Sequence, residues 1–370
     1  MWHTCCTNFS DGSINGNTIH QSLRDDPGPL HTYRTTTSSA GTVGPKHQNE
    51  PDAPQGPYNV AGQDVFGHSP SSIFLADGHG KNGQMAALNA IEMHKLVPVS
   101  PEMLQRTPLK KIEHHIREKL VTKMLEADFP YSGSTFTSMA IVYGARKRWI
   151  ITVNIGDSEA HIVYKDRMHT CSLSHTWDDL VLYNRYVKLV DRPRNVCYNR
   201  WNASKHQVLG PDSSYRPVML YDIDHEKRSA SVNPVGVEWV SNLWKRFNKP
   251  SIKNGTQSVR VFPKKHQNWG SSVIINGRAR GQNMAYYGDC IERELTKVPI
   301  DMIHVYIHEI EAKENIIGII QSDGVANKRS IEECWRVTRS TRDASKYLEG
   351  MENATDDMSA CMIVSEPIIE

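Results

Sequence analysis

Four aspartates of this chain lie where apolar, strand-like segments begin or end. They are Asp77 after SIFLA, Asp157 after ITVNIG, Asp323 after IIGIIQS, and Asp356 just before DMSACMIV. Carboxylates gathered from several strand ends repel one another, so such a cluster is stable at neutral pH only if cations neutralise it. Oxygen ligands of this kind select Mg²⁺ or Mn²⁺ rather than zinc. Two such ions close together suit the in-line hydrolysis of a phosphate ester.

The segments around these aspartates have the patterns of short strands and amphipathic helices. Helical spacing of apolar residues predicts helices over 82–97 and 109–127, and the DGHG sequence at 77–80 predicts a loop. Runs of β-branched and aromatic residues predict strands over 31–37, 72–76, 134–143, 148–155, 159–164, 316–321 and 359–364. This order favours a layered α+β fold with antiparallel sheets over a regular βαβ succession.

The composition excludes several classes of protein. The 370 residues carry 43 basic and 41 acidic side chains, a formal charge of +2, which excludes a general polyanion-binding protein. No stretch approaches the roughly 20 apolar residues of a membrane helix, and no secretory signal is recognisable at the N-terminus. The seven cysteines are odd in number and show no CxxC spacing, so we expect neither a disulfide framework nor a zinc site. An intracellular location, cytoplasmic or nuclear, is the expectation.

The segment from about residue 200 to 270 differs from the rest of the chain. Between residues 224 and 270 there are nine Lys or Arg against three Asp or Glu. The segment is either a solvated insertion with its own small core or a surface that meets a phosphorylated or nucleic-acid partner.

Six short motifs, in order, resemble the landmarks of the metal-dependent serine/threonine protein phosphatases of the PP2C (PPM) family. The resemblance spans roughly residues 44–365, apart from the region 200–270. The motifs are DGHG at 77–80, SGST at 132–135, NIGDS at 154–158, Arg280 with Gly288-Asp289, SDG at 322–324 and DDMS at 356–359.

This resemblance implies an α+β fold, a four-layer α-β-β-α sandwich with two antiparallel sheets. It also implies a domain organisation in which residues 1–40 form a polar, partly flexible N-terminal arm. Residues 41–370 would then form the phosphatase domain, with the basic insertion at about 200–270 as a flap.

The resemblance also implies roles for individual residues. The carboxylate of Asp77 should bridge two Mg²⁺ or Mn²⁺ ions, and the backbone carbonyl of Gly78 should complete one site. A water between the ions should attack phosphorus, with His79 as general acid; the alternative for His79 is a simple loop hydrogen bond. Further metal ligands are expected at Asp323 and Asp356, at Asp157 for a third, weaker ion, and at Asp52.

The first motif of the family departs most from its pattern here. An arginine that grips phosphate and an acidic pair are expected, and the segment GPKHQNEPDA at 44–53 occupies their place. His47 falls at the arginine position, Pro51 replaces the first acidic residue, and Asp52 matches the second. Phosphate binding is therefore expected from Lys46 and His47, with Glu50 as a substitute carboxylate if the loop shifts by one residue. Two further departures, Lys81 and Glu159, lie beside the expected ligands.

Three functions fit these observations. The first is hydrolysis of phosphoserine and phosphothreonine in proteins by an active, monomeric phosphatase without a membrane partner. The second is a pseudophosphatase, a binding module that keeps the fold but has lost turnover, which the missing arginine favours. The third, a nucleotide or nucleic-acid phosphohydrolase, rests on the basic region alone.

Overall fold

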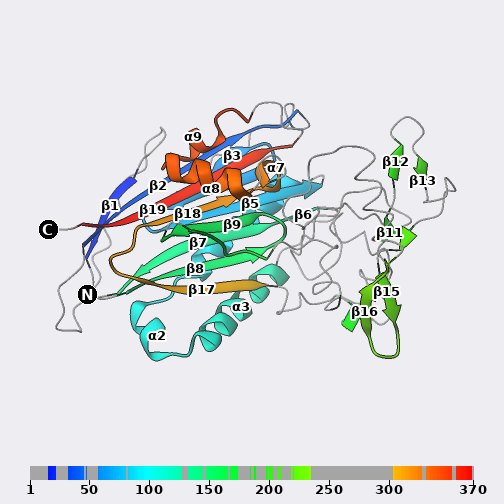
Figure 1. The fold of residues 1–370 in the computed structure, drawn as a ribbon, viewed down its shortest axis with the longest axis horizontal. Coiled ribbons are helices and arrows are strands. Elements are labelled where there is room, and N and C mark those ends of the chain that lie inside the picture. Colours follow the sequence, from blue (N-terminus) through cyan, green and yellow to red (C-terminus); the bar gives the residue numbers. More distant parts are fainter. Residues whose placement is uncertain are drawn as a thin grey trace.

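The described parts of the chain form two antiparallel β-sheets packed face to face, with helices on both outer surfaces (Figure 1). The computed structural model describes residues 16–21, 32–45, 47, 57–80, 82–126, 132–144, 147–165, 167–173, 184, 187–188, 197–198, 200–202, 207–209, 218–219, 221–234, 303–326, 331–351 and 356–368.

Both sheets contain only antiparallel pairs among the described strands. The six-stranded sheet has the order β1 (Gly16–Gln21), β2 (Thr32–Thr42), β19 (Met358–Ile368), β18 (Ile316–Gln321), β9 (Glu159–Tyr164), β10 (Arg167–Thr170). The seven-stranded sheet has the order β17 (His304–Glu311), β8 (Lys147–Ile155), β7 (Phe136–Tyr143), β5 (Ser72–Gly80), β4 (Asp64–Ser69), β3 (Asn59–Ala61), and β6 (Ser132–Ser134) pairs with β5.

The helices fall into two groups, one on each sheet. The first group is α1 (Gly83–Ile91), the 3₁₀ helix η1 (Glu92–Leu96), α2 (Pro101–Arg106) and α3 (Leu109–Glu126). The second group is α7 (Asp323–Ala326), α8 (Ile331–Ser340) and α9 (Ala344–Leu348). Side-chain caps begin α2 and α9, where Ser100 Oγ accepts the N–H of Met103 and Asp343 Oδ1 accepts the N–H of Lys346.

Three apolar clusters separate four layers. One lies between the two sheets and includes Ile73, Met139 and Ile363. A second joins the seven-stranded sheet to the first helix group, and a third joins the six-stranded sheet to the second group. The predicted α+β four-layer sandwich with two antiparallel sheets is therefore confirmed. Because β8 lies inside this sandwich with both faces covered, its residues Arg148–Ile155 are all buried.

The predicted loop at DGHG is wrong, because β5 continues through it to Gly80. The reason is β6, which offers backbone partners to this extension by pairing Gly78 with Ser134 and Gly80 with Ser132. The helix predicted over 82–97 is divided into α1 and η1. Strands β4 and β17 and helix α2 were not predicted.

The chain between β10 and β17 contributes three small two-stranded sheets within its described parts. They pair β11 (Cys197–Tyr198) with β14 (Val218–Met219), β12 (Arg200–Asn202) with β13 (Gln207–Leu209), and β15 (Tyr221–Asp224) with β16 (Ser229–Val232). The last hairpin is tied to the body of the protein, since Ile223 and Ala230 pack against the helix-side core. The flap role of this region and the division of the chain at residue 40 remain predictions, although β2 already enters the sheet at Thr32. Arg280 and Gly288-Asp289 lie outside the described residues.

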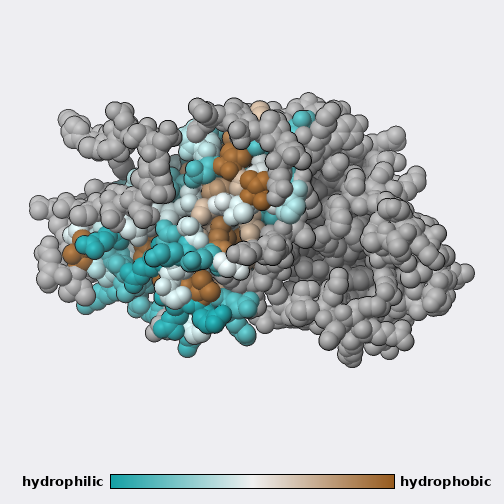
Figure 2. Space-filling model, turned by 90° about the horizontal axis from the view of Figure 1, so that it is seen from above, coloured by the Kyte–Doolittle hydropathy of each residue, from teal (hydrophilic) through white to brown (hydrophobic). Residues whose placement is uncertain are grey.

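Figure 2 shows the molecule from above, where hydrophilic side chains border a narrow run of apolar ones. Helices α8 and α9 lie on this side of the sandwich in Figure 1. None of the helices within the described ranges has the length and apolar character needed to cross a membrane.

Candidate functional site

Asp77 is held in place by a buried frame that reaches the turn carrying Asp157. The backbone N–H of Asp77 donates to Thr135 Oγ1 at 2.9 Å, and the N–H of Thr135 donates to the carbonyl of Asp77 at 2.8 Å. Thr135 Oγ1 lies 2.8 Å from Ser158 Oγ, and both side chains are fully buried. The SGST and GDS motifs therefore fix the strand end that presents Asp77.

Asp64, which the sequence analysis missed, lies directly opposite Asp77. It begins β4, and the register of the β4–β5 pair sets Asp64 against Asp77. Its side chain is 1% exposed, and Oδ2 accepts a hydrogen bond from Ser359 Oγ at 2.6 Å. A signal was present in the sequence, because Asp64 immediately precedes the apolar residues Val65 and Phe66, as Asp356 precedes its own strand.

The paired ends of β18 and β19 bring together the two segments that carry Asp323 and Asp356. The N–H of Ser322 donates to the carbonyl of Ser359, and the N–H of Ser359 donates to Ser322 Oγ, both at 3.0 Å. Asp323 begins the short helix α7 immediately after this contact. The local geometry thus joins two sequence motifs that lie more than thirty residues apart.

The electrostatics of Asp77 show that the predicted strand-end aspartates lie close together. Burial raises the pKa of Asp77 well above its usual range, and the negative charges of Asp64, Asp323, Asp157 and Asp356 raise it further. The arrangement thus favours the protonated form of Asp77 unless positive charge is supplied. The roles of the four strand-end aspartates as metal ligands remain predictions.

The donor set fits hard divalent cations. Burial raises the pKa of Asp64 as well, with further contributions from Asp357 and Asp323, while hydrogen bonds from Ser359 and Ser322 oppose the shift. Asp64 Oδ1 is buried without a hydrogen-bond partner. An orphaned carboxylate oxygen beside other carboxylates is what Mg²⁺ or Mn²⁺ would satisfy, because both ions prefer oxygen ligands.

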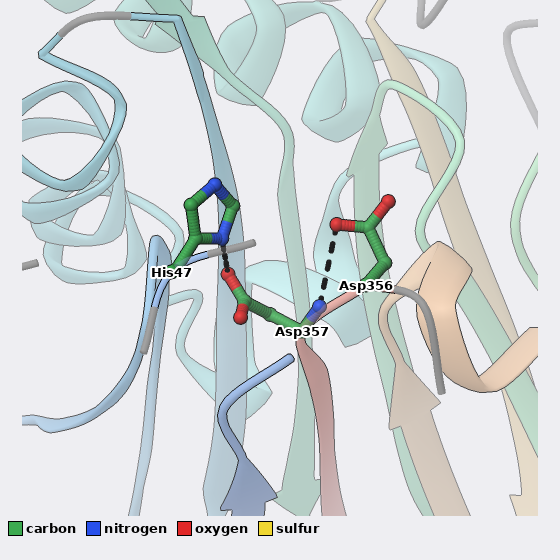
Figure 3. A group of neighbouring side chains, drawn as sticks. All are labelled: His47, Asp356 and Asp357. Atoms are coloured by element: carbon green, nitrogen blue, oxygen red, sulfur yellow. Dashed lines mark hydrogen bonds and ion pairs between the residues drawn. The ribbon is translucent and has the colours of Figure 1, made fainter. Parts of the chain in front are cut away.

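His47, predicted to bind phosphate, contacts the start of β19. Its Nδ1 lies 2.5 Å from Asp357 Oδ2, and its side chain is 17% exposed (Figure 3). The N–H of Asp357 donates to Asp356 Oδ1 at 3.3 Å. His47, Asp356 and Asp357 each bring a potential ligand atom within 4.8 Å of the others. Asp357 is the second site residue that the sequence analysis missed.

Of four further predicted residues, the structure describes two in whole or in part and leaves two outside its description. Gly78 lies in β5, where its N–H donates to the carbonyl of Gln63 at 3.2 Å. The backbone of His79 pairs with Gly133, and its side chain is outside the description. Lys46 and Asp52 lie outside the described residues, so their roles remain predictions.

Glu159, one of the departures from the family pattern, belongs to a buried polar chain beside the carboxylates. Its Oε2 accepts a hydrogen bond from Gln321 Nε2 at 2.9 Å and lies 3.1 Å from His161 Nε2. Gln321 Oε1 in turn accepts a hydrogen bond from Tyr347 Oη at 2.7 Å. Glu159 therefore links β9 and β18 to helix α9.

No family model matches the sequence, and no curated protein is similar to it. The catalytic domain of the serine/threonine protein phosphatase PstP, solved with two manganese ions, shares 12% identity and a TM-score of 0.43 over 91% of this chain and 100% of that one. Serine-threonine phosphatase 2C from Toxoplasma gondii shares 11% identity and a TM-score of 0.45, over 95% of this chain and 100% of that one. The PPM Ser-Thr phosphatase MsPP from Mycobacterium smegmatis shares 14% identity and a TM-score of 0.38, over 88% of this chain and 97% of that one. These sequence identities and TM-scores are too low to assign a function, so the function has to be derived from the chemistry of the carboxylates.

Proposed function

We propose that this chain is a metal-dependent phosphatase that hydrolyses phosphoserine and phosphothreonine in proteins. The observation that carries the proposal is the cluster around the buried Asp77, in which Asp64, Asp157, Asp323 and Asp356 all raise the pKa of one carboxyl group. Such a concentration of like charge opposes folding unless something neutralises it, and it is typical of functional sites.

The cluster supports two-cation phosphate chemistry. Two bound Mg²⁺ or Mn²⁺ ions would supply positive charge for the carboxylates and the phosphate and would acidify a water for attack on phosphorus. In this scheme Asp77, Asp323 and Asp356 would hold the two cations. Asp157 would bind a third, weaker cation.

The remaining residues act on the substrate in this proposal. His79 donates a proton to the departing serine or threonine oxygen, because an alkoxide is a poor leaving group. Lys46 and His47 contact the phosphate oxygens in place of an arginine. Asp52 supports the first cation. A phosphorylated protein is the proposed substrate, because the motif resemblance is to protein phosphatases.

A binding module without turnover is the second candidate. One observation favours it: His47, at the position expected for a phosphate-gripping arginine, directs Nδ1 to Asp357. An imidazole that makes this contact cannot offer phosphate the two-pronged contact of a guanidinium. Phosphate affinity is therefore the property on which the two candidates differ.

The test is hydrolysis of p-nitrophenyl phosphate and of a phosphothreonine peptide with Mn²⁺, with Mg²⁺ and with EDTA. Asp77→Asn removes one carboxylate from the cluster at nearly constant volume. Asp343→Asn is the matched control, because Asp343 caps α9 and asparagine also caps helices. Metal-dependent turnover that Asp77→Asn abolishes and Asp343→Asn retains is the expected result. A folded wild-type protein that binds Mn²⁺ without turnover would establish the binding module instead.

A further inference from the structure

The carboxylate of Asp357 accepts hydrogen bonds from three donors in two separate segments. Oδ1 accepts the N–H of Gly44 at 2.8 Å, and Oδ2 accepts the N–H of Gln63 at 2.9 Å. Oδ2 also lies 2.5 Å from His47 Nδ1. Asp357 is 4% exposed, so these bonds are shielded from water. One side chain thus fastens the 44–47 segment and the turn before β4 to the start of β19.

Two glycines pack closely against Asp357 and the backbone that precedes it. A Cβ on Gly62 would lie 2.3 Å from either oxygen of Asp357, and Gly62 has a φ of +62°. A Cβ on Gly44 would lie 2.4 Å from the carbonyl carbon of Asp356. Both turns approach the strand start so closely that only glycine fits.

This packing distinguishes Asp357 from its neighbour Asp356. Both oxygens of Asp357 already accept hydrogen bonds from protein N–H groups, and the 2.5 Å contact between Oδ2 and His47 Nδ1 is one of them. In Figure 3 the carboxylate of Asp357 points toward His47, whereas the carboxylate of Asp356 points away from His47. Asp357 therefore has a geometry suited to holding protein groups, whereas Asp356 remains the candidate ligand.

The hydrogen bond also defines the orientation of His47. A carboxylate only accepts hydrogen bonds, so Nδ1 of His47 carries a proton in this contact. This bond sets the ring plane of His47, and it therefore also sets the direction in which the Nε2 edge points relative to the start of β19. A histidine held in this way has less rotational freedom to lose when it binds a ligand.

We propose that Asp357 is a positioning residue and not a metal ligand: it anchors the 44–47 segment beside the carboxylate cluster and orients His47 for contact with the substrate phosphate. This inference rests on the proposed function for its substrate. The pairing of Asp357 and His47 itself stands on the contacts above.

Two substitutions separate anchoring from contact. In Asp357→Asn one oxygen becomes an NH₂ group, which faces a backbone N–H and leaves that donor unsatisfied. In His47→Asn the amide can still donate to Asp357 from near the Nδ1 position, but the outer edge of the ring is lost. The matched controls are Asp343→Asn and His94→Asn; His94, in η1, donates from Nδ1 to the carbonyl of Ile91 at the end of α1.

The measurements are hydrogen exchange of the Gly44 and Gln63 amides, and calorimetric binding of Mn²⁺ and of inorganic phosphate with Mn²⁺ present. We expect Asp357→Asn to speed exchange of at least one amide by about 10-fold and to weaken phosphate binding by about 10-fold. His47→Asn should weaken phosphate binding by a similar factor with exchange unchanged. The double variant should bind phosphate no more weakly than either single one, because the residues act as a unit.

Mn²⁺ affinity decides between positioning and ligation. It should fall by a clearly smaller factor in Asp357→Asn, which removes a nearby charge but no ligand, than in Asp356→Asn, where a ligand is lost and the fall should exceed about 10-fold. Equal losses in the two variants would make Asp357 a ligand and overturn the proposal. So would unchanged phosphate binding in His47→Asn, a variant that keeps the anchor and is expected to fold even if Asp357→Asn does not.

These readouts need no turnover, so they separate this inference from the proposed function. A wild-type protein that binds phosphate through His47 without hydrolysing a phosphopeptide would refute the phosphatase and leave the positioning role intact. Turnover that is indifferent to both substitutions would support the phosphatase and refute the positioning role. In an active enzyme, Asp357→Asn should raise KM by a larger factor than it lowers kcat.

Discussion

Both ends of the sandwich contain a buried ionisable group, but only at one end do neighbouring protein groups stabilise its charge. At one end the guanidinium of Arg148 is fully buried. Its terminal nitrogens donate to the carbonyl oxygens of Ser365, Ala312 and Glu314, and it lies 4.6 Å from the ring centroid of Tyr33. At the other end Asp77 faces carboxylates, which cannot donate to it once they are ionised.

The same strands build both ends. Strand β8 begins beside Arg148 and leads into the turn with Asp157, and β19 runs from Asp357 to the Ser365 that Arg148 contacts. Carbonyl oxygens and an aromatic face complete the surroundings of one cation, with only the Nε of Arg148 left without a partner. Ionised carboxylates cannot stabilise one another in this way, because they repel one another and offer no hydrogen-bond donors. The comparison indicates that the arginine end is structural, whereas a bound cation would stabilise the carboxylate end.

The largest effect is expected from Asp77→Asn. Turnover should fall about 10³-fold or more, because the proposed cation ligand is lost and even residues behind metal ligands are worth 10–100-fold. In EDTA the same variant should be more stable than wild type by about 1–3 kcal/mol, because a repelled buried charge has been removed. Steady-state kinetics and urea unfolding measure the two quantities. A loss of activity accompanied by a loss of stability in EDTA would contradict this account.

Arg148→Met should give the opposite combination. The carbonyls of Ser365, Ala312 and Glu314 lose their donor, so the free energy of unfolding should fall by about 3 kcal/mol. Mn²⁺ affinity should remain that of wild type, because the carboxylate end is untouched. Arg167→Met on the exposed strand β10 is the control and should change stability by less than about 0.5 kcal/mol. Loss of Mn²⁺ binding in a folded Arg148→Met protein would show that the two ends are not independent.

Removal of metal should expose a pH dependence of stability. The raised pKa values of Asp64 and Asp77 mean that the folded state binds more protons than the unfolded state above the ordinary aspartate value of 3.8. Their contribution to stability is therefore complete below that value and is lost as pH rises through the folded pKa values. Urea unfolding in EDTA should show this decline, and Mn²⁺ at 100 times its Kd should add about 2.7 kcal/mol at neutral pH. Equal stability with Mn²⁺ and with EDTA at pH 8 would count against a cation site.

The smallest effect concerns His308, at a sheet edge away from both ends. Its Nε2 lies 2.7 Å from Tyr164 Oη, and burial, with the neighbouring His169, lowers its pKa, while Glu309 opposes the shift. A histidine with a lowered pKa contributes stability at neutral pH that is lost as pH falls through 6.5. Because the group is partly exposed, the loss should be below about 1 kcal/mol. His308→Asn should reduce the fall in stability between pH 7 and pH 5; an unchanged profile would assign that fall to other groups.

Local pattern predicted the elements well where one face of a segment is apolar. Strands β7, β8 and β18 and helix α3 lie close to their expected ranges, since their periodicity depends only on which face is buried. The pattern failed at DGHG because β6 extends β5 through a polar, glycine-rich sequence. It also failed to identify β17, whose partner β8 is distant in the chain, and β4, which pairs with the adjacent strand β5.

The sequence by itself determined which aspartates terminate or precede strands, and this was enough to predict Asp77, Asp157, Asp323 and Asp356 as a carboxylate cluster. Only the tertiary structure added the two missed residues, Asp64 and Asp357. Asp64 enters the cluster through the β4–β5 register, and Asp357 binds His47, 310 residues away in the chain. The physical reason is that short motifs specify the local conformation of a residue. Which buried charges meet depends on strand register and packing across the whole sandwich.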